Sequence, residues 1–236
     1  MFAAIDIFVL LGPPGAGKGT LSQFCVSNFG WQQVAAGNLC RKHIAEGTKI
    51  GLQIAHAIAS GNLAAEGLVS DMVFDWLNLN QLVKPIILDG FPRTITQAEM
   101  LNQFFQMNQD RFKLNVVRLK ASDDHVLTRM LTRYVCERSD CQMVYSSANV
   151  ELQSKDGITC DKCAGGLIKR QDDSLGSIRE RLHVYHQHEN GLIGYYSQIG
   201  QSIIEIDVER ELSVIFNRFV DAFGVKNSVC MTNGIN

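Results

Sequence analysis

Residues Ile5–Thr20 read IDIFVLLGPPGAGKGT, a short apolar run followed at once by a glycine-rich loop. The apolar run is typical of a parallel strand that is buried on both faces. The loop has the pattern G-x-x-x-x-G-K, in which successive backbone N–H groups wrap a polyphosphate and the next helix directs the positive end of its dipole at the same anion. We therefore expect this segment to bind a nucleotide, with Lys18 on its outer phosphates.

The loop ends differently from the commonest form of this pattern. Gly19 follows Lys18, so the hydroxyl that would contact a magnesium ion comes one position later, on Thr20. The residues expected to hold the nucleotide phosphates are Gly12, Gly15, Ala16, Gly17, Lys18, Gly19 and Thr20.

Size and composition fit one α/β domain that carries insertions. The 236 residues are 46% hydrophobic, which is enough to bury a large core, and the formal net charge of −2 gives no general basic field. A surface that coats nucleic acid is therefore not expected. Met1–Ala4 contains no basic residue and the apolar run after it is too short to span a membrane, so we expect a cytoplasmic protein without a membrane partner.

Five short apolar runs alternate with stretches of helical periodicity, which predicts a parallel sheet with helices on both faces. These runs are Ile5–Leu11, Gln33–Ala35, Ile86–Leu88, Leu114–Leu119 and Ile203–Ile206. Two stretches break the alternation, a helical one at about residues 37–79 and a polar, cysteine-bearing one at about residues 134–171. Both are expected at the carboxyl edge of the sheet, where open α/β folds bind ligands. Residues 229–236 show no period and indicate a loose tail.

A second motif, IILDGFPRT at Ile86–Thr94, places an acid at the end of a predicted strand, before a tight turn and an arginine. Asp89 is where a protein with a phosphate-binding loop would order the waters around its magnesium ion. The alternative is that Asp89 only caps a helix and Arg93 is a surface charge. Together, the loop G-x-P-G-x-G-K-G-T and the pattern D-G-F-P-R-T-x-x-Q resemble the adenylate kinase family of nucleoside monophosphate kinases.

The resemblance covers most of the chain. It continues at Gly37-x-x-x-Arg41, Gly61-Asn62-Leu63, Arg129-x-x-x-Arg133, Arg170-x-Asp172-Asp173, Arg179-x-Arg181 and Tyr195-Tyr196. It implies the three-layer α/β sandwich of the P-loop NTPases, with five parallel strands in the order 2-3-1-4-5. The expected parts are a P-loop core (1–36, 72–133 and 172–225), a helical monophosphate-binding insertion (37–71), a lid insertion (134–171) and a flexible tail (226–236).

The same resemblance implies a monomeric enzyme that transfers a phosphoryl group reversibly from Mg-ATP to AMP, giving two ADP. The residues implied in catalysis are Lys18, Asp89, Arg93, Arg133, Arg170 and Arg181. Arg129 and Arg133 are also implied to contact ATP, with Arg129 over its adenine. The residues implied to bind AMP are Ala36, Arg41, Leu63, Ala64, Gly90, Arg93, Gln97, Arg170 and Arg181, with Gln97 on the adenine edge. Thr20 and Asp89, the latter through water, are implied to hold magnesium.

The chemistry of the reaction favours the same set of residues independently. Transfer of a γ-phosphoryl group to a monophosphate brings two anions together, and the acceptor oxygen is already ionised and needs no general base. A kinase acting on a sugar hydroxyl would instead need a positioned carboxylate. Guanidinium groups fit phosphate oxygens bidentately. Arg179 and Arg181 lie about 200° apart on a helix, so one of them faces the site, and the resemblance favours Arg181.

The acceptor half departs from the family pattern. The family usually has Ser-Thr-Gly-Asp where this chain has Ala35–Asn38, often has lysine at Asn62, and has LVPDE where Leu63–Gly67 reads LAAEG. A lost hydroxyl hydrogen bond costs about 0.5–1.5 kcal/mol, which weakens binding without abolishing it. AMP therefore remains the expected acceptor, and another nucleoside monophosphate is the alternative. Val208 stands where a glycine often lies near the ATP base.

Four of the seven cysteines form two local pairs across a polar hairpin. Cys136 and Cys141 are separated by four residues, and Cys160 and Cys163 by two. This spacing is typical of a closed structural zinc site, and long-lid members of the family carry one, commonly with C-x-x-C as the first pair. A disulfide pair and unused thiols are the alternatives. We expect zinc, because a lid of roughly 38 residues with few large apolar side chains needs a staple to fold.

A function from a different class is a nucleotide-gated module whose cysteine knuckle binds nucleic acid. Such a module would interleave basic and aromatic residues on the cysteine loop. This loop has one aromatic residue, Tyr145, and its acidic residues balance its basic ones. His183, His186 and His188 fall on a polar helix flank and are expected to be surface residues. We therefore favour the phosphotransferase.

Overall fold

The computed structural model describes residues 4–59, 66–79, 82–108, 111–138, 141, 143–170 and 172–225, without the side chains of residues 57–59. Leu63 and Ala64, together with Asn62 and the expected tail at 226–236, lie outside the described residues. None of the helices in the described part is long and apolar enough to cross a membrane.

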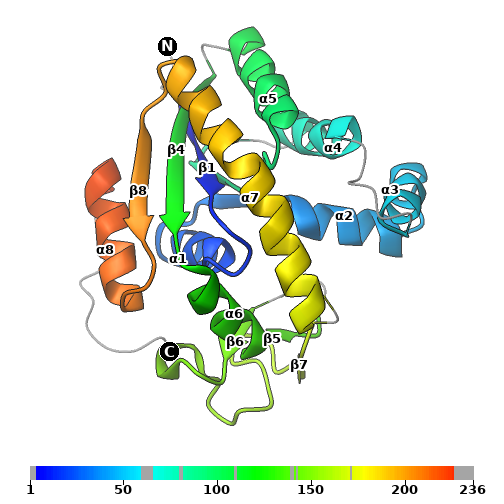
Figure 1. The fold of residues 1–236 in the computed structure, drawn as a ribbon, viewed down its shortest axis with the longest axis vertical. Helices are drawn as coiled ribbons and strands as arrows, with labels where there is room; N and C mark the ends of the chain where they lie inside the picture. The colour runs from blue at the N-terminus through cyan, green and yellow to red at the C-terminus, as the bar shows by residue number, and fades with distance from the viewer. Residues whose placement is uncertain are drawn as a thin grey trace.

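A five-stranded parallel sheet lies at the centre of the described chain (Figure 1). Its strands are β1 (Ile5–Leu11), β2 (Gln32–Ala35), β3 (Ile86–Asp89), β4 (Phe112–Lys120) and β8 (Ile203–Asp207). They lie in the order β2-β3-β1-β4-β8, and every neighbouring pair is parallel. Since β8 is the fifth strand of this sheet along the chain, the predicted order 2-3-1-4-5 is confirmed.

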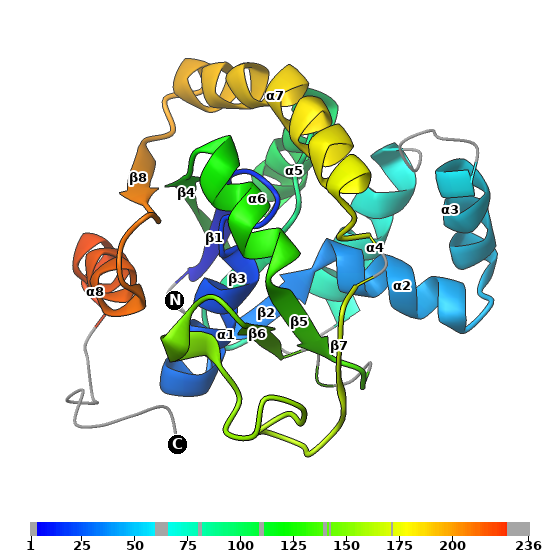
Figure 2. The ribbon, with the colours of Figure 1, turned by 60° about the horizontal axis from the view of Figure 1, so that its bottom comes forward.

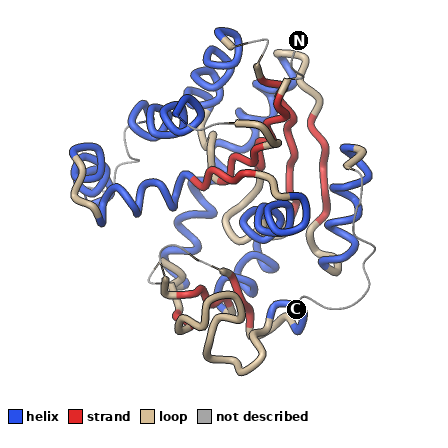
Figure 3. The backbone as a smooth tube through the Cα atoms, turned by 180° about the vertical axis from the view of Figure 1, so that it is seen from behind, coloured by secondary structure: helices blue, strands red, loops and turns tan. Residues whose placement is uncertain are grey.

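Helices cover both faces of this sheet. The helices of the described chain are α1 (Lys18–Phe29), α2 (Ala36–Ala45), α3 (Lys49–Ala59), α4 (Glu66–Leu79), α5 (Ile95–Met107), α6 (Asp123–Leu131), α7 (Leu175–Gln198) and α8 (Leu212–Phe223). Seen from behind, the strands run side by side between two groups of helices (Figure 3). The predicted three-layer α/β architecture is therefore confirmed.

The two largest hydrophobic clusters of the described residues lie on opposite faces of β1, which is buried on both. Ile7 and Val9 pack into a cluster with side chains of α4, α5 and α7, such as Leu101. Phe8 and Leu10, which point to the other face, pack into a cluster with α1 and α8. An apolar residue at every position from Ile7 to Leu11 is what two buried faces require, and this is why the strand could be predicted without alternation in its sequence.

Two parts of the chain lie beyond the main sheet. Helices α2 and α3 pack on each other, and α2 begins where β2 ends. The second part is a small antiparallel sheet in the order β6-β5-β7. Its elements are β5 (Arg133–Cys136), β6 (Val144–Ser146), the short 3-10 helix η1 (Val150–Leu152) and β7 (Leu167–Ile168). Figure 2 shows the α2–α3 pair and the small sheet on separate sides of the main sheet.

Candidate active site

A cleft of about 1240 Å³ opens at the carboxyl ends of the strands, between the main sheet, α2 and the small sheet. Most of the predicted site residues that the structure describes line it. They are Gly12, Gly15, Gly17, Lys18, Gly19, Thr20, Arg41, Asp89, Gly90, Arg93, Arg129, Arg133, Arg170 and Arg181, together with Val208. Residues from opposite ends of the sequence are thus brought to one cavity, at the edge where open parallel sheets bind ligands.

The glycine-rich loop takes a shape that its glycines permit. Gly12, Gly15 and Gly17 have φ values of 138°, 79° and 95°, which side chains rarely adopt. A Cβ on Gly12 would also lie 2.5 Å from the backbone oxygen of Leu119, so the loop passes close to the end of β4. Gly17 is the N-cap residue of α1 and offers no side chain to the N–H groups there, which leaves those donors to a ligand.

Lys18 is folded back over its own loop. Its Nζ donates to the backbone oxygens of Gly12, at 2.7 Å, and Pro13, at 2.8 Å. Burial lowers the pKa of Lys18 to about 8, although the negative charge of Asp89 opposes this shift. An ammonium group removed from water and surrounded by arginines is stabilised by an arriving polyphosphate.

Asp89 ends β3 beside the loop. Burial raises the pKa of its carboxyl group, while Lys18 acts in the opposite direction. Gln33 on β2 donates its Nε2 hydrogen to Asp89 Oδ2 at 3.4 Å. A Cβ placed on Gly19 would lie 3.5 Å from the same oxygen, so the loop end that carries Thr20 adjoins this carboxylate. A hydroxyl and a carboxylate in one cavity are oxygen donors of the kind that Mg²⁺ prefers.

Arg93 follows a turn that contains a cis peptide bond between Phe91 and Pro92. Its Nε donates to the backbone oxygen of Gly90 at 2.9 Å, and its backbone N–H donates to Gln97 Oε1 at 2.8 Å. The hydroxyl of Thr94 caps α5 by accepting from the Gln97 backbone N–H. These bonds fix the direction of the Arg93 side chain into the cleft.

Three predicted residues lie just behind the described lining of the cleft. Ala16, Ala36 and Gln97 are buried, and the carboxamide oxygen of Gln97 is engaged by the Arg93 backbone. The expected roles of Ala36 and Gln97 toward a nucleotide stay predictions.

The arginines from the far side of the cleft are joined by two acids. Arg133 makes a bidentate pair with Asp173, at 2.8 and 2.6 Å, and Arg170 makes one with Asp172, at 2.8 and 2.5 Å. Arg181 on α7 reaches both acids, at 3.3 Å to Asp172 and 3.4 Å to Asp173. Three guanidinium groups are therefore held together. They come from β5, from α7 and from the segment that follows β7.

These two acids, which join the three arginines, were given no role from the sequence. Burial alone would raise the pKa of Asp172, but its hydrogen bonds to Arg170 and the nearby positive charges bring the pKa below its ordinary value. The available signal was their adjacency in the segment Arg170-x-Asp172-Asp173. Arg179 is exposed and is not among the described residues that line the cleft, in agreement with the preference for Arg181.

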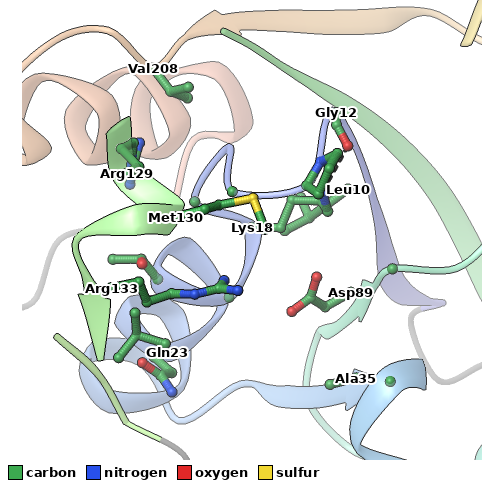
Figure 4. A pocket seen from close by; sticks show the side chains of 18 of the residues that line it. Leu10, Gly12, Lys18, Gln23, Ala35, Asp89, Arg129, Met130, Arg133 and Val208 are labelled. Atoms are coloured by element: carbon green, nitrogen blue, oxygen red, sulfur yellow. Dashed lines mark hydrogen bonds between the residues drawn. The ribbon is translucent and has the colours of Figure 1, made fainter. Parts of the chain in front are cut away.

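Arg129 and Arg133 approach the cleft from α6 and β5. A Cβ on Gly17 would lie 3.0 Å from Nη2 of Arg129, so this guanidinium covers the start of α1. Burial lowers the pKa of Arg129, and the charge of Arg133 lowers it further. Figure 4 shows Arg129 on the side of Val208, whereas Arg133 points into the cleft toward the side of Asp89. The two arginines thus face different parts of the cavity.

The four paired cysteines meet at one point in the small sheet. Their sulfur atoms all lie within 4.8 Å of one another, with Cys136 Sγ 3.4 Å from Cys163 Sγ and Cys141 Sγ 3.7 Å from Cys160 Sγ. Four thiolates around one zinc ion, each about 2.3 Å from it, would be about 3.8 Å apart. The cluster therefore fits the ligand set of a structural zinc ion, and the alternative of disulfides is not realised since these cysteines are free.

The histidines that the sequence left unassigned have local partners. His186 Nε2 lies 2.9 Å from Asp123 Oδ1, and His183 Nε2 lies 2.9 Å from Gln187 Nε2. Within the described part of the chain, the cysteine cluster is the one group of three or more His, Cys, Asp or Glu side chains that could share a metal ion.

Comparisons with known proteins agree with this arrangement. A family model described as adenylate kinase matches residues 10–201. The chain is 35% identical over 207 residues to an adenylate kinase of Kosmotoga olearia, which covers 88% of this chain and 94% of the relative. It is 34% identical over 195 residues to an adenylate kinase of Chlamydia felis, covering 82% of this chain and 86% of the relative. An adenylate kinase of Fervidobacterium nodosum is 34% identical over 213 residues, which is 89% of this chain and 95% of the relative.

Proposed function

The chain belongs to the adenylate kinase family, and we propose that its cleft transfers a phosphoryl group reversibly from Mg-ATP to AMP, giving two ADP. The observation that carries this proposal is the position of the joined guanidinium groups of Arg133, Arg170 and Arg181. They line the same cleft as the glycine-rich loop and as Arg41 and Arg93. Cations that converge between two anion-binding sites are what phosphoryl transfer between two nucleotides requires.

ATP is assigned to the side of the glycine-rich loop. The backbone N–H groups from Gly12 to Thr20 and the open start of α1 hold its phosphates. Lys18 exchanges its two backbone carbonyl partners for phosphate oxygens. Arg129 lies over the start of α1 and is positioned to cover the nucleoside. Val208 is buried beside this part of the cleft and narrows the space for the base.

AMP is assigned to the opposite side, where α2 begins. Arg41 and Arg93 hold its phosphate, and Gly90 lets the chain turn beneath it. Gln97 and Ala36 lie close behind this surface and contact the base once the acceptor insertion closes on it. Leu63 and Ala64, which lie outside the described residues, belong to the same proposed pocket.

The transfer itself needs charge stabilisation rather than proton transfer. The attacking phosphate oxygen of AMP is ionised, so no residue has to remove a proton from it. The charge that spreads over the transferring group is neutralised by Arg133, Arg170 and Arg181. Their guanidinium groups are held in position by Asp172 and Asp173. Preorganised donors of this kind contribute about 10²- to 10³-fold each to turnover.

When bound together with ATP, magnesium would supply a counter-charge for the phosphates. Thr20 and Asp89 are the residues that would hold it, Asp89 through water, because both line the cleft on the loop side. Gln33 keeps one Asp89 oxygen in place. The carboxylate is buried against Lys18, and a second cation beside it favours its charged form.

We assign a different role to each of three parts of the chain. The P-loop core comprises 1–36, 72–133 and 172–225, and residues 37–71 and 134–171 are insertions that close over AMP and ATP respectively. Their closure excludes water, which would otherwise hydrolyse ATP. The protein is proposed to work as a monomer in the cytoplasm and without nucleic acid. The free thiols support a reducing compartment.

Zinc is proposed as a structural ion in the second insertion. Cys136, Cys141, Cys160 and Cys163 would supply four thiolates, a set that leaves no position for substrate. Metal analysis of chelator-washed protein should find one zinc per chain. Zinc well below one per chain, in protein that remains folded, would contradict the four-thiolate site.

The acceptor is tested by comparing AMP, GMP, CMP and UMP in a coupled assay with ATP as donor. We expect turnover with AMP to exceed turnover with the other three by at least an order of magnitude. Equal or faster turnover with a non-adenine monophosphate would replace AMP and leave the reaction type intact. The absence of transfer to any of the four would overturn the proposed function.

A further inference from the structure

In the acceptor half, the hydrogen-bond partner of the Arg41 side chain is the uncharged Asn38. Arg41 Nη2 donates to Asn38 Oδ1, and the two residues lie three positions apart on the first turns of α2. A Cβ on Gly37 would lie 3.4 Å from Arg41 Nη1, so the guanidinium lies back along the start of the helix. Asn38 and Arg41 line the cleft together with Arg93 and Arg170.

The start of α2, like that of α1, lacks a capping side chain among the described residues. The helices α5, α6 and α7 are capped by the hydroxyls of Thr94, Ser122 and Ser174, and the first N–H of α8 donates to Glu151 Oε2. The N-cap residue of α8, Glu211, makes no side-chain cap of its own, and Glu151 takes its place. Among the described residues no side chain caps α1 or α2, whose N-cap residues are Gly17 and Ala35. Both of these residues line the cleft.

The first turn of α2 also contains no acidic residue. A carboxylate at position 38 would satisfy the helix dipole and would pair with Arg41, so it would be favourable for the stability of α2. It would also neutralise the guanidinium that faces the acceptor. An amide oxygen at the same position orients Arg41 and leaves its full charge available to a phosphate.

We propose that Asn38 is a positioning residue, which holds Arg41 over the acceptor phosphate without neutralising it and so maintains acceptor affinity at the expense of helix stability. This inference rests on the proposed function, since it takes Arg41 as a ligand of the AMP phosphate. It also accounts for the departure at this position, because the positive charge offsets hydrogen bonds that Ala35 and Ala36 cannot make to an acceptor.

The test compares Asn38→Asp and Asn38→Ala with the wild-type chain. For Asn38→Asp we expect the KM for AMP to rise about threefold to tenfold, while kcat and the KM for ATP stay within about twofold. Because the carboxylate caps the dipole of α2, the melting temperature should rise by about 1–3 °C in the same variant. Asn38→Ala should raise the KM for AMP by about twofold to threefold without raising the melting temperature.

Asn78→Asp is the matched control, because Asn78 is exposed on α4, away from the described lining of the cleft, and the substitution adds the same charge. It should leave both KM values unchanged. The effect of Asn38→Asp on the KM for AMP should also shrink at 0.5 M salt, as expected for a charge at the cleft mouth.

The proposal is overturned if the KM for AMP in Asn38→Asp is no higher than in Asn38→Ala, or if the KM for ATP rises equally. Failure of the proposed function has a different signature. In that case the wild-type chain itself forms no ADP from AMP, and neither variant carries information on Asn38.

Discussion

In the proposed function, the two halves of the cleft bind anions by different means. On the donor side the ligands are mostly backbone N–H groups, set by glycines with positive φ and by Lys18, which is buried and bonded to two carbonyls of its own loop. On the acceptor side the proposed ligands are the side chains of Arg41 and Arg93, and α2, which carries Arg41, packs on α3.

This difference explains why most departures from the family's sequence pattern lie in the acceptor half. A backbone cradle depends on a few glycines and on the strand beneath it, so a substitution there alters the whole loop. A side-chain site can lose a hydroxyl and recover affinity through a charge that is left unneutralised, as we propose for Arg41 beside Asn38. The donor half is therefore constrained by conformation, whereas the acceptor half is adjusted by electrostatics.

The largest effect on turnover is expected from Lys18→Met, a substitution in the donor half. Methionine has a similar length, so the loop should keep its shape, but the cation that reaches the phosphates is lost. We expect kcat to fall by about 10²- to 10³-fold, as for other preorganised groups at a transferring phosphate. Steady-state kinetics with both nucleotides varied will measure this. A fall of less than tenfold would show that the backbone cradle suffices without Lys18.

Arg93→Lys probes the acceptor half. Arg93 is oriented by its bond to the Gly90 oxygen, and lysine cannot present two parallel donors to a phosphate. The KM for AMP should rise about tenfold, and the KM for ATP should change by less than about twofold. Arg179→Lys is the matched control, because Arg179 is exposed on α7 outside the described lining of the cleft. Equal changes in the two KM values for Arg93→Lys would remove the distinction between the halves.

Gly51→Ala tests whether the acceptor half depends on the packing of α2 against α3. A Cβ on Gly51 would lie 2.0 Å from the backbone oxygen of His43, and neither backbone can yield without moving a helix. We expect a loss of about 1–3 kcal/mol in stability and a severalfold rise in the KM for AMP. Chemical denaturation and kinetics will measure both. Gly67→Ala, where a Cβ meets no heavy atom of the described residues within 4 Å, is the control. An unchanged KM for AMP in Gly51→Ala would mean that Arg41 is positioned independently of α3.

The smallest effect is a pH dependence confined to the donor half. Burial lowers the pKa of Lys18 from 10.5 to about 8, so between these values the folded chain binds fewer protons than the unfolded chain. The contribution of this group to stability therefore becomes more favourable as the pH rises through that window. A bound polyphosphate favours the protonated amine, so ATP affinity should weaken as the pH rises through about 8, by about threefold between pH 7.5 and pH 8.5.

Calorimetry in buffers of different ionisation enthalpy measures the proton that accompanies this binding. At pH 8.5 we expect the wild-type chain to take up roughly half a proton or more with ATP, and Lys18→Met to take up much less. Equal uptake by the two proteins would assign the proton to another group. The affinity for AMP should change less over the same range, because its proposed ligands are arginines that stay charged.

The sequence predicted the centre of the main sheet well because β1 and β3 are buried on both faces. Predicted and observed bounds coincide for β1 and differ by a residue or two for β3 and β4, where the strand ends are less apolar. The small antiparallel sheet was expected only as a polar hairpin. Its strands have two to four residues, too few to show a period, and they are set by pairing and by the cysteine cluster.

The site was predictable where a motif is local and was missed where contacts are distant in sequence. The loop and Asp89 are read from adjacent residues. The bond from Gln33 to Asp89 joins positions 56 residues apart, and the pair of Arg133 and Asp173 joins positions 40 residues apart. No spacing rule relates such residues, and only the fold places them together. The engagement of the Gln97 oxygen by the Arg93 backbone likewise depends on the geometry of one turn.

Phosphorus NMR of the wild-type chain with equimolar ATP and AMP tests most directly whether a phosphoryl group is transferred from the donor half to the acceptor half of the cleft. We expect two ADP to appear for each ATP consumed, with no inorganic phosphate above the background of spontaneous hydrolysis. One ADP and one inorganic phosphate per ATP, with AMP unchanged, would contradict the account, because the donor half would then act without an acceptor half.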